Sequence, residues 1–130
     1  MHIIHKISEQ MNEQFDSEKC SGVQNVEYKS EYNGKKVNCI SVTFIYDNNQ
    51  YDIKLLFIDV SEFELDRDNI VFECMELLFY DDEDGTPIII GDECGRTRIV
   101  CKDVKFIEKK PMTSAWVSFL DEFYRYYGRY

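Results

Sequence analysis

The amino-acid sequence predicts an α+β fold in which an antiparallel β-meander sheet of about six to seven strands forms a sandwich or half-barrel. An N-terminal helix and a C-terminal amphipathic helix are expected to pack on this sheet. Apolar residues alternate with polar ones along much of 37–80, and they recur at every third or fourth position near both termini. The first pattern is typical of half-buried strands, and the second is typical of helices with one apolar face.

Two neighbouring runs and the turns that bound them predict the central strands. Residues 38–46 and 51–57 carry apolar side chains at every second position, and the turn-forming residues 47–50 separate them. The two runs therefore predict a β-hairpin. Asn33-Gly34 is a strong two-residue hairpin signal after a first strand at 23–32.

The later strands are less regular. Residues 70–80 are apolar on both faces, which is typical of a central strand covered on both sides. Residues 88–90 predict a brief strand, and residues 97–108 predict the last one. Within the last strand, Cys101 and Val104 are three positions apart, so in a regular strand their side chains would point to opposite faces. If both side chains lie in the core, a β-bulge is expected between them.

Two helices are expected at the ends of the chain. Apolar residues of 2–15 recur at helical spacing, and polar residues occupy the other face. Residues 116–127 carry an aromatic stripe at the same spacing, after a capping residue at Thr113 or Ser114 and before Gly128. We expect this stripe to pack on one face of the sheet.

Composition predicts a single domain spanning residues 1–130. The chain has 44% hydrophobic residues and a net charge of −10, and disorder would require low hydrophobicity as well as charge. A chain of this length buries roughly two thirds of its unfolded surface. The sequence shows neither a signal peptide nor a run of about 18 apolar residues. We therefore expect a cytoplasmic protein without a membrane segment.

Catalytic and metal-binding patterns are missing from the sequence. Five cysteines form no C-x-x-C pair and are odd in number, which predicts reduced, buried thiols and no disulfide framework or zinc site. The only histidines, His2 and His5, lie at the N-terminus, where chains are usually mobile. No glycine-rich phosphate loop, G-x-S-x-G or H-E-x-x-H motif occurs. The sequence thus predicts a protein that is not an enzyme and that holds no cofactor or metal.

Acidic residues are concentrated in the middle of the chain. Residues 47–95 contain 15 acidic and 2 basic residues, whereas residues 96–130 have a net charge of +4. If the acidic turns converge on one edge of the sheet, they form a surface that repels nucleic acid and attracts a basic partner. Acidic loops that only confer solubility are the alternative.

A partner-binding surface is predicted from these acidic residues and from the C-terminal end. Tyrosine is enriched at protein interfaces, and two tyrosines near the C-terminus lie outside the aromatic stripe, so this end could join a partner or a homodimer. The candidate partner-binding residues are Glu62, Glu64, Asp81, Asp82, Glu83, Asp84, Asp92, Glu93, Tyr126 and Tyr130.

The acidic turn at residues 81–85 also raises the question of calcium binding. An EF-hand loop needs glycine at its sixth position and ligands at its first and twelfth. With Gly85 at the sixth position, Tyr80 and Gly91 fall at the first and twelfth, and neither supplies a side-chain ligand of the required kind. A solvated hairpin tip is expected, and a looser calcium site is the alternative.

The order of the central elements resembles that of a known class of proteins. The segment Phe57-Ile-Asp-Val-Ser-Glu-Phe-Glu-Leu65 is followed by the run 70–80, the acidic turn and a strand over 98–106. This order is similar to small β-rich immunity proteins of bacterial polymorphic-toxin systems. The resemblance implies binding to a cognate toxin, often a nuclease with a basic cleft, and it assigns no functional residue.

We therefore expect a small acidic inhibitor that binds and neutralises a basic protein partner, for example a nuclease-type toxin. A nucleic-acid mimic that blocks a DNA-binding protein, such as an anti-restriction or anti-CRISPR factor, is one alternative. A ligand-binding, lipocalin-like module is another, and it would show an apolar cavity between the sheet and the C-terminal helix. A structural homo-oligomer is the third. Direct binding to nucleic acid or to a membrane is not expected.

Overall fold

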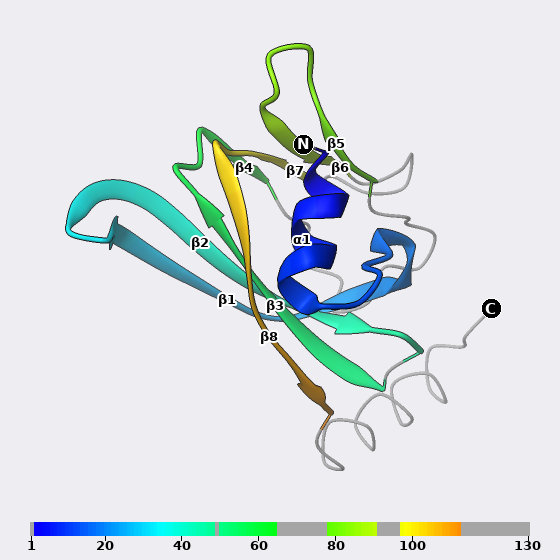
Figure 1. Cartoon of the computed structure of the whole chain (residues 1–130). Helices are drawn as coiled ribbons and strands as arrows, with labels where there is room; N and C mark the ends of the chain where they lie inside the picture. Colours follow the sequence, from blue (N-terminus) through cyan, green and yellow to red (C-terminus); the bar gives the residue numbers. More distant parts are fainter. Residues whose placement is uncertain (1, 49, 65–77, 91–96, 113–130) are drawn as a thin grey trace.

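In the part of the chain that the structure describes, the fold consists of two antiparallel β-sheets and one α-helix. The structure, a computed structural model, describes residues 2–48, 50–64, 78–90 and 97–112. Its elements are α1 (Ile3–Met11), the short 3₁₀ helix η1 (Ser17–Lys19), β1 (Cys20–Tyr32), β2 (Lys35–Tyr46), β3 (Tyr51–Ile58), β4 (Glu62–Glu64), β5 (Leu78–Asp81), β6 (Pro87–Ile90), β7 (Arg98–Val100) and β8 (Asp103–Pro111). The first sheet has the strand order β1-β2-β3-β8, and the second has the order β4-β7-β6-β5 (Figure 1).

The antiparallel architecture and the N-terminal helix confirm the sequence prediction. The described strands number eight, against six to seven expected, and they form two open sheets, each with two edge strands. The run predicted as a central strand over 70–80 is described only from Leu78 onward, where β5 forms an edge of the second sheet. The predicted C-terminal helix falls on residues 113–130, outside the described residues.

Both hairpin turns of the first sheet lie where the sequence predicts them. Asn33 and Gly34 have positive φ angles of 51° and 78°, as in the type I′ turns that match the twist of paired strands. Asp47 and Asn48 in the next turn have φ angles of 55° and 57°, which short polar side chains tolerate. These turns align β2 with β3 so that alternate apolar residues share one face.

The core lies between the first sheet, α1 and the second sheet. Val42, Phe44, Leu55 and Phe57 project to the same side of the first sheet, because directly paired residues in antiparallel strands share a face. Buried residues of α1, β5, β6 and β7 join the same cluster. Burying each large apolar side chain stabilises the fold by roughly 1.5–3 kcal/mol. The second sheet is thus attached to the first through its inner, apolar face.

Phe15 links the N-terminal segment to both sheets. The helix predicted over 2–15 ends earlier, where Asn12 takes a left-handed conformation with a φ of 59°. The Phe15 amide donates to Ser8 Oγ at 2.9 Å, which holds the chain after this turn. The Phe15 ring stacks on Tyr46 with centroids 5.8 Å apart and meets Phe79 edge-on at 5.3 Å. Phe15 therefore belongs to the core, although it lies outside the helix.

Helix α1 covers the edge of the first sheet at β8. Its polar contacts there are Lys6 with Asp103 and Gln10 Oε1 with the Phe106 amide at 2.6 Å. Just after the helix, Glu13 Oε1 accepts from Lys109 Nζ at 2.6 Å. Lys109 Nζ also lies 4.3 Å from the centroid of the Tyr51 ring, a cation–π contact. These contacts occupy an edge strand whose free backbone groups would otherwise be open to pairing with another strand.

The predicted β-bulge between Cys101 and Val104 is wrong. The chain leaves the second sheet after Val100 and enters the first at Asp103. The change in parity therefore marks a change of sheet, and both apolar residues are buried without a bulge. A bulge does occur later in β8, at Ile107, whose side chain is 42% exposed.

Candidate functional site

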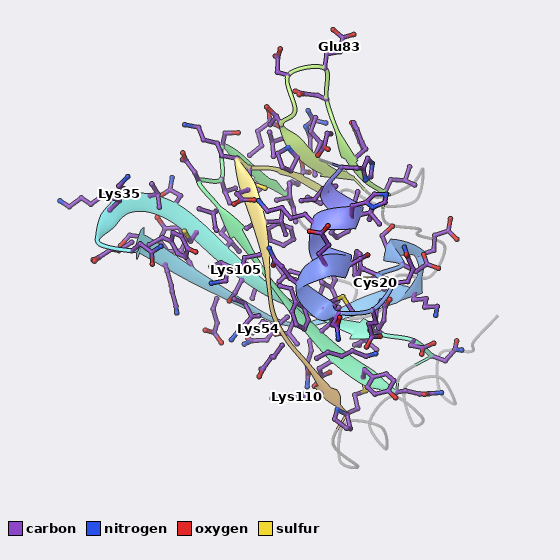
Figure 2. All side chains as sticks on the ribbon, viewed as in Figure 1. Cys20, Lys35, Lys54, Glu83, Lys105 and Lys110 are labelled. Carbon is purple, nitrogen blue, oxygen red and sulfur yellow. The ribbon has the colours of Figure 1, made fainter. Side chains whose placement is uncertain are left out.

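The acidic turn joins β5 to β6, and one of its own carboxylates holds it in place. Asp82 Oδ1 accepts hydrogen bonds from the amides of Asp84 at 2.9 Å and Thr86 at 2.8 Å. Gly85 has a φ of 80°, a conformation that favours glycine. Asp82 therefore stabilises the turn, whereas Glu83 extends into solvent at the end of the hairpin (Figure 2).

Glu62 and Glu64 lie on β4, at an edge of the same sheet. The cross-strand row that begins at Glu62 continues through Val100 and Ile88 to Tyr80. Tyr80 immediately precedes the acidic turn. This row crosses four strands, so it spans roughly 14 Å at the usual strand spacing. Glu62 and the acidic turn thus lie at the same end of the second sheet.

Arg98 lies beside the two glutamates and binds one of them. Its Nε donates to Glu62 Oε2 at 2.6 Å, and Arg98 is paired across the strands with Glu64. The hydrogen bond to Glu62 raises the pKa of the Arg98 guanidinium. Because both partners are exposed, this ion pair contributes little to stability. It nevertheless neutralises part of the charge that Glu62 brings to the surface.

Asp81, Asp82, Glu83 and Asp84 lie at this end of the sheet without an ion pair among the described residues. Glu64 is also in no such ion pair, but its cross-strand row runs through Arg98 and Ile90 to Leu78, at the end of β5 away from the turn. We call Asp81, Glu83 and Asp84 the acidic end, and we set Asp82 apart because its carboxylate holds the turn. Glu83 and Asp84 are exposed, and Asp81 is half-buried.

The remaining candidates cannot be added to this group. Asp92, Glu93, Tyr126 and Tyr130 lie outside the described residues. The predicted tyrosine-rich interface, including its use in a homodimer, therefore stays a prediction.

Lysines gather on a different part of the molecule. Lys54, Lys105 and Lys110 share the outer face of the first sheet, and Lys35 lies at the end of the β1–β2 hairpin (Figure 2). The four strands of the first sheet carry seven lysines and five carboxylates, so this sheet has a small net positive charge, whereas the turn between β5 and β6 is acidic. A charge distribution of this kind orients a protein as it approaches a charged partner.

Two surface hollows are lined by described residues. Their volumes are about 480 and 400 Å³. The larger lies at the base of the β1–β2 hairpin and is lined by Ser30, Glu31, Lys36, Val37, Asn38 and Asp59. Both are lined mainly by polar and charged residues, whereas a lipocalin-like module requires an apolar cavity. The described hollows therefore do not favour that alternative.

Asp52 lines the smaller hollow, and the sequence reasoning missed it. Only 3% of the residue is exposed, and burial raises the pKa of its carboxyl group. The pairing of the predicted central hairpin could have revealed Asp52, because this residue lies directly opposite Ile45. A carboxylate at a buried position of a strand is unusual, because removing its charge from water is costly.

Within the described residues there is neither a metal-binding cluster of side chains nor a membrane-spanning helix. Those residues contain no group of three or more histidine, cysteine, aspartate or glutamate side chains placed to hold a metal ion. His2 caps α1, since its Nδ1 accepts from the Ile4 amide at 3.1 Å. Within the described part of the chain, no helix has the length and apolar character needed to cross a membrane.

The described cysteines, Cys20, Cys39 and Cys101, are buried and have free thiols. Burial raises the pKa of Cys20 far above its ordinary value and raises that of Cys101 to about 12. The thiolate needed for nucleophilic attack therefore does not form at these two positions near neutral pH. Cys74 and Cys94 lie outside the described residues.

We expect the native protein to resist alkylation at Cys20 and Cys101. At about pH 8, iodoacetamide should modify both thiols only after unfolding in denaturant, because the fold blocks both access and thiolate formation. Peptide mass spectrometry of native and unfolded samples measures the modification at each site. Rapid modification of either thiol in the native sample would contradict its buried position.

Comparison with known proteins yields no relative: no family model, no curated protein and no solved structure matches the chain.

Proposed function

We propose that this protein binds and neutralises a basic protein partner, as an immunity protein neutralises a cognate toxin. The observation that supports this proposal is the acidic end. Asp81, Glu83 and Asp84 lie together at one end of the second sheet without an ion pair among the described residues. A basic surface, such as the nucleic-acid-binding cleft of a nuclease-type toxin, would supply the opposite charges.

The charge of the acidic end acts first on the rate of association. Complementary surfaces attract over a distance of about 8–10 Å at physiological salt, and this attraction raises association rates by roughly 10- to 1,000-fold. The lysines on the other sheet strengthen the effect, because they turn the acidic end toward a positive partner.

The acidic end also borders apolar side chains that a partner could cover. Leu78 and Tyr80 alternate along β5 and therefore lie on the same face as Glu62, whose cross-strand row includes Tyr80. Leu78 is 47% exposed, although it is a large apolar residue. Protein interfaces are typically built in this way, with apolar or aromatic residues in the centre and charged residues at the rim. Desolvation of Leu78 and Tyr80 would then supply affinity, while the carboxylates supply rate and specificity.

A protein partner is favoured over mimicry of a nucleic acid. A mimic would present carboxylates at phosphate-like spacing along one surface, since DNA carries a charge about every 1.7 Å along its axis. Here the carboxylates of the acidic end are confined to the turn between β5 and β6 and the residue before it.

The proposal is tested with a partner captured on the wild-type protein from its source cells and then purified. A triple variant, Asp81→Asn with Glu83→Gln and Asp84→Asn, should lower the association rate by about tenfold or more at low salt. Asp82 is left intact because it holds the turn. Surface plasmon resonance measures the rates, and the wild-type association rate should fall steeply as salt is raised.

The matched control removes the same charge from other exposed positions: Glu9→Gln with Glu18→Gln and Glu31→Gln. This control should change the association rate by no more than about threefold, because its carboxylates belong to α1, η1 and β1 and not to the acidic turn. Equal losses in both triple variants would reduce the effect to overall charge and overturn the proposal. So would a captured partner whose own activity is unaffected by an excess of the wild-type protein.

A further inference from the structure

A second site lies on the outer face of the first sheet, away from the acidic end. The hollow of about 400 Å³ found there draws residues from all four strands of that sheet. Its lining residues are Gln24, Asn25 and Glu27 of β1, Thr43 of β2, Asp52 and Lys54 of β3, and Glu108 and Lys110 of β8. A volume of this size falls within the range of small-molecule sites, roughly 300–1,000 Å³.

A β-bulge places an amide at the carboxylate of Asp52. Val23 and Asn25 pair with consecutive residues of β2, so Gln24 is the extra residue of β1. Bulges re-aim side chains in this way and often occur near functional sites. With its nitrogen turned toward the carboxylate, the Gln24 amide donates to Asp52 Oδ1 at 2.6 Å and Oδ2 at 2.9 Å.

The hollow is lined by three carboxylates and two lysines, so one carboxylate has no lysine partner there. Lys54 Nζ lies 3.8 Å from Glu27 Oε1, and Lys110 Nζ lies 3.8 Å from Glu108 Oε1. Both lysines thus face an exposed glutamate, and the buried Asp52 is in no ion pair among the described residues. Asp52 therefore retains a charge that Gln24, a neutral donor, does not compensate.

We propose that this hollow binds a guanidinium group, with the Asp52 carboxylate as its counter-ion. Each carboxylate oxygen can accept two hydrogen bonds, and among the described residues only the Gln24 amide donates to the oxygens of Asp52. A guanidinium is planar, matches a carboxylate with two parallel N–H donors, and is more weakly hydrated than an ammonium group.

The guanidinium could come from a free arginine derivative or from an arginine side chain on a protein surface. The site does not depend on the proposed inhibitor function, since it lies on the other sheet and uses none of the residues of the acidic end. Loss of one function by mutation should therefore leave the other intact.

The test is a titration of the full chain with acetyl-arginine amide and with a capped peptide containing one arginine. NMR chemical shifts should change at residues 24–27, 43, 52–54 and 108–110, and Asp52→Asn should weaken binding about tenfold or more, as expected for loss of a charged hydrogen-bonding partner. The control Glu9→Gln removes an equal charge from an exposed helix position and should change the affinity by less than about twofold. Binding of both probes identifies a small-molecule site, and binding of the peptide alone identifies a protein-derived arginine.

Three outcomes would overturn the proposal. The first is that neither probe binds at millimolar concentration. The second is that Asp52→Asn binds as tightly as the wild type. The third is that acetyl-citrulline amide, which has the same shape without the charge, binds as tightly as acetyl-arginine amide.

A measurement of the stability of the Asp52→Asn variant shows whether it still folds. Burial raises the pKa of Asp52 in the folded state, while Lys110 opposes and Glu108 reinforces the change. The folded protein therefore binds this proton more tightly than the unfolded chain, and its stability falls as pH rises from about 4 through the folded pKa. Asp52→Asn removes this loss, so it should be at least as stable as the wild type at neutral pH in thermal unfolding.

Discussion

Replacing Phe15 with alanine is expected to lower the free energy of unfolding by about 3–5 kcal/mol. The Phe15 ring is buried and contacts Tyr46 of the first sheet and Phe79 of the second. Its removal leaves a cavity at the place where the N-terminal segment and both sheets meet. Most small domains have a total stability of only about 5–15 kcal/mol, so this variant should lose a large part of its stability. Urea unfolding followed by circular dichroism measures the loss.

Phe15→Leu separates the aromatic contacts from the volume of the side chain. Leucine keeps much of the buried apolar surface but loses the stacked and edge-on ring contacts, which contribute about 0.5–1.5 kcal/mol each. This variant should therefore fall between the wild type and Phe15→Ala. Equal stability of all three proteins would show that Phe15 does not occupy the core.

The second large effect is expected at the centre of the second sheet. Ile99 is fully buried between its cross-strand neighbours Phe63 and Ile89. Ile99→Ala should lower the free energy of unfolding by about 2–5 kcal/mol. Because residues of both sheets form one hydrophobic cluster, we expect the first sheet to lose stability by the same amount.

Hydrogen exchange with mass spectrometry tests this coupling. Peptides from β2 and β3 should lose the same protection as peptides from β6 and β7, since a single cooperative domain opens as one unit. Ile107→Ala provides the control, because Ile107 lies at the bulge with 42% of its surface exposed, and it should cost about 0.5 kcal/mol or less. Loss of protection confined to the second sheet would contradict the prediction of a single domain.

The two proposed sites lie on different sheets. The acidic end projects from the second sheet, where association can begin at long range, whereas Asp52 is buried on the outer face of the first sheet, beside paired lysines. Surface carboxylates act mainly on association rates, and a buried carboxylate acts mainly on affinity and dissociation. Variants at the two sites should therefore differ in which rate constant they change.

Several roles could not be predicted from periodicity because they arise from contacts between distant residues. Asp82 was expected to face a partner, yet its carboxylate is used by the turn itself. Asp52 was not singled out, since a single polar residue in an alternating run carries no information about what covers it. The parity change after Cys101 was correctly noticed but wrongly explained, because a bulge and a change of sheet give the same local pattern.

What the sequence alone determined was local: the alternation that forms antiparallel strands, the Asn33-Gly34 and 47–50 turns, the apolar face of α1, and the excess of acidic residues between 47 and 95. Only the tertiary structure decided which sheet each strand joins, that Phe15 packs beyond the helix, and that Asp52 is buried under a bulge. The physical reason is that backbone propensity and side-chain period act over a few neighbouring residues. Strand partners and burial depend instead on contacts that close long loops, and short-range patterns do not encode them.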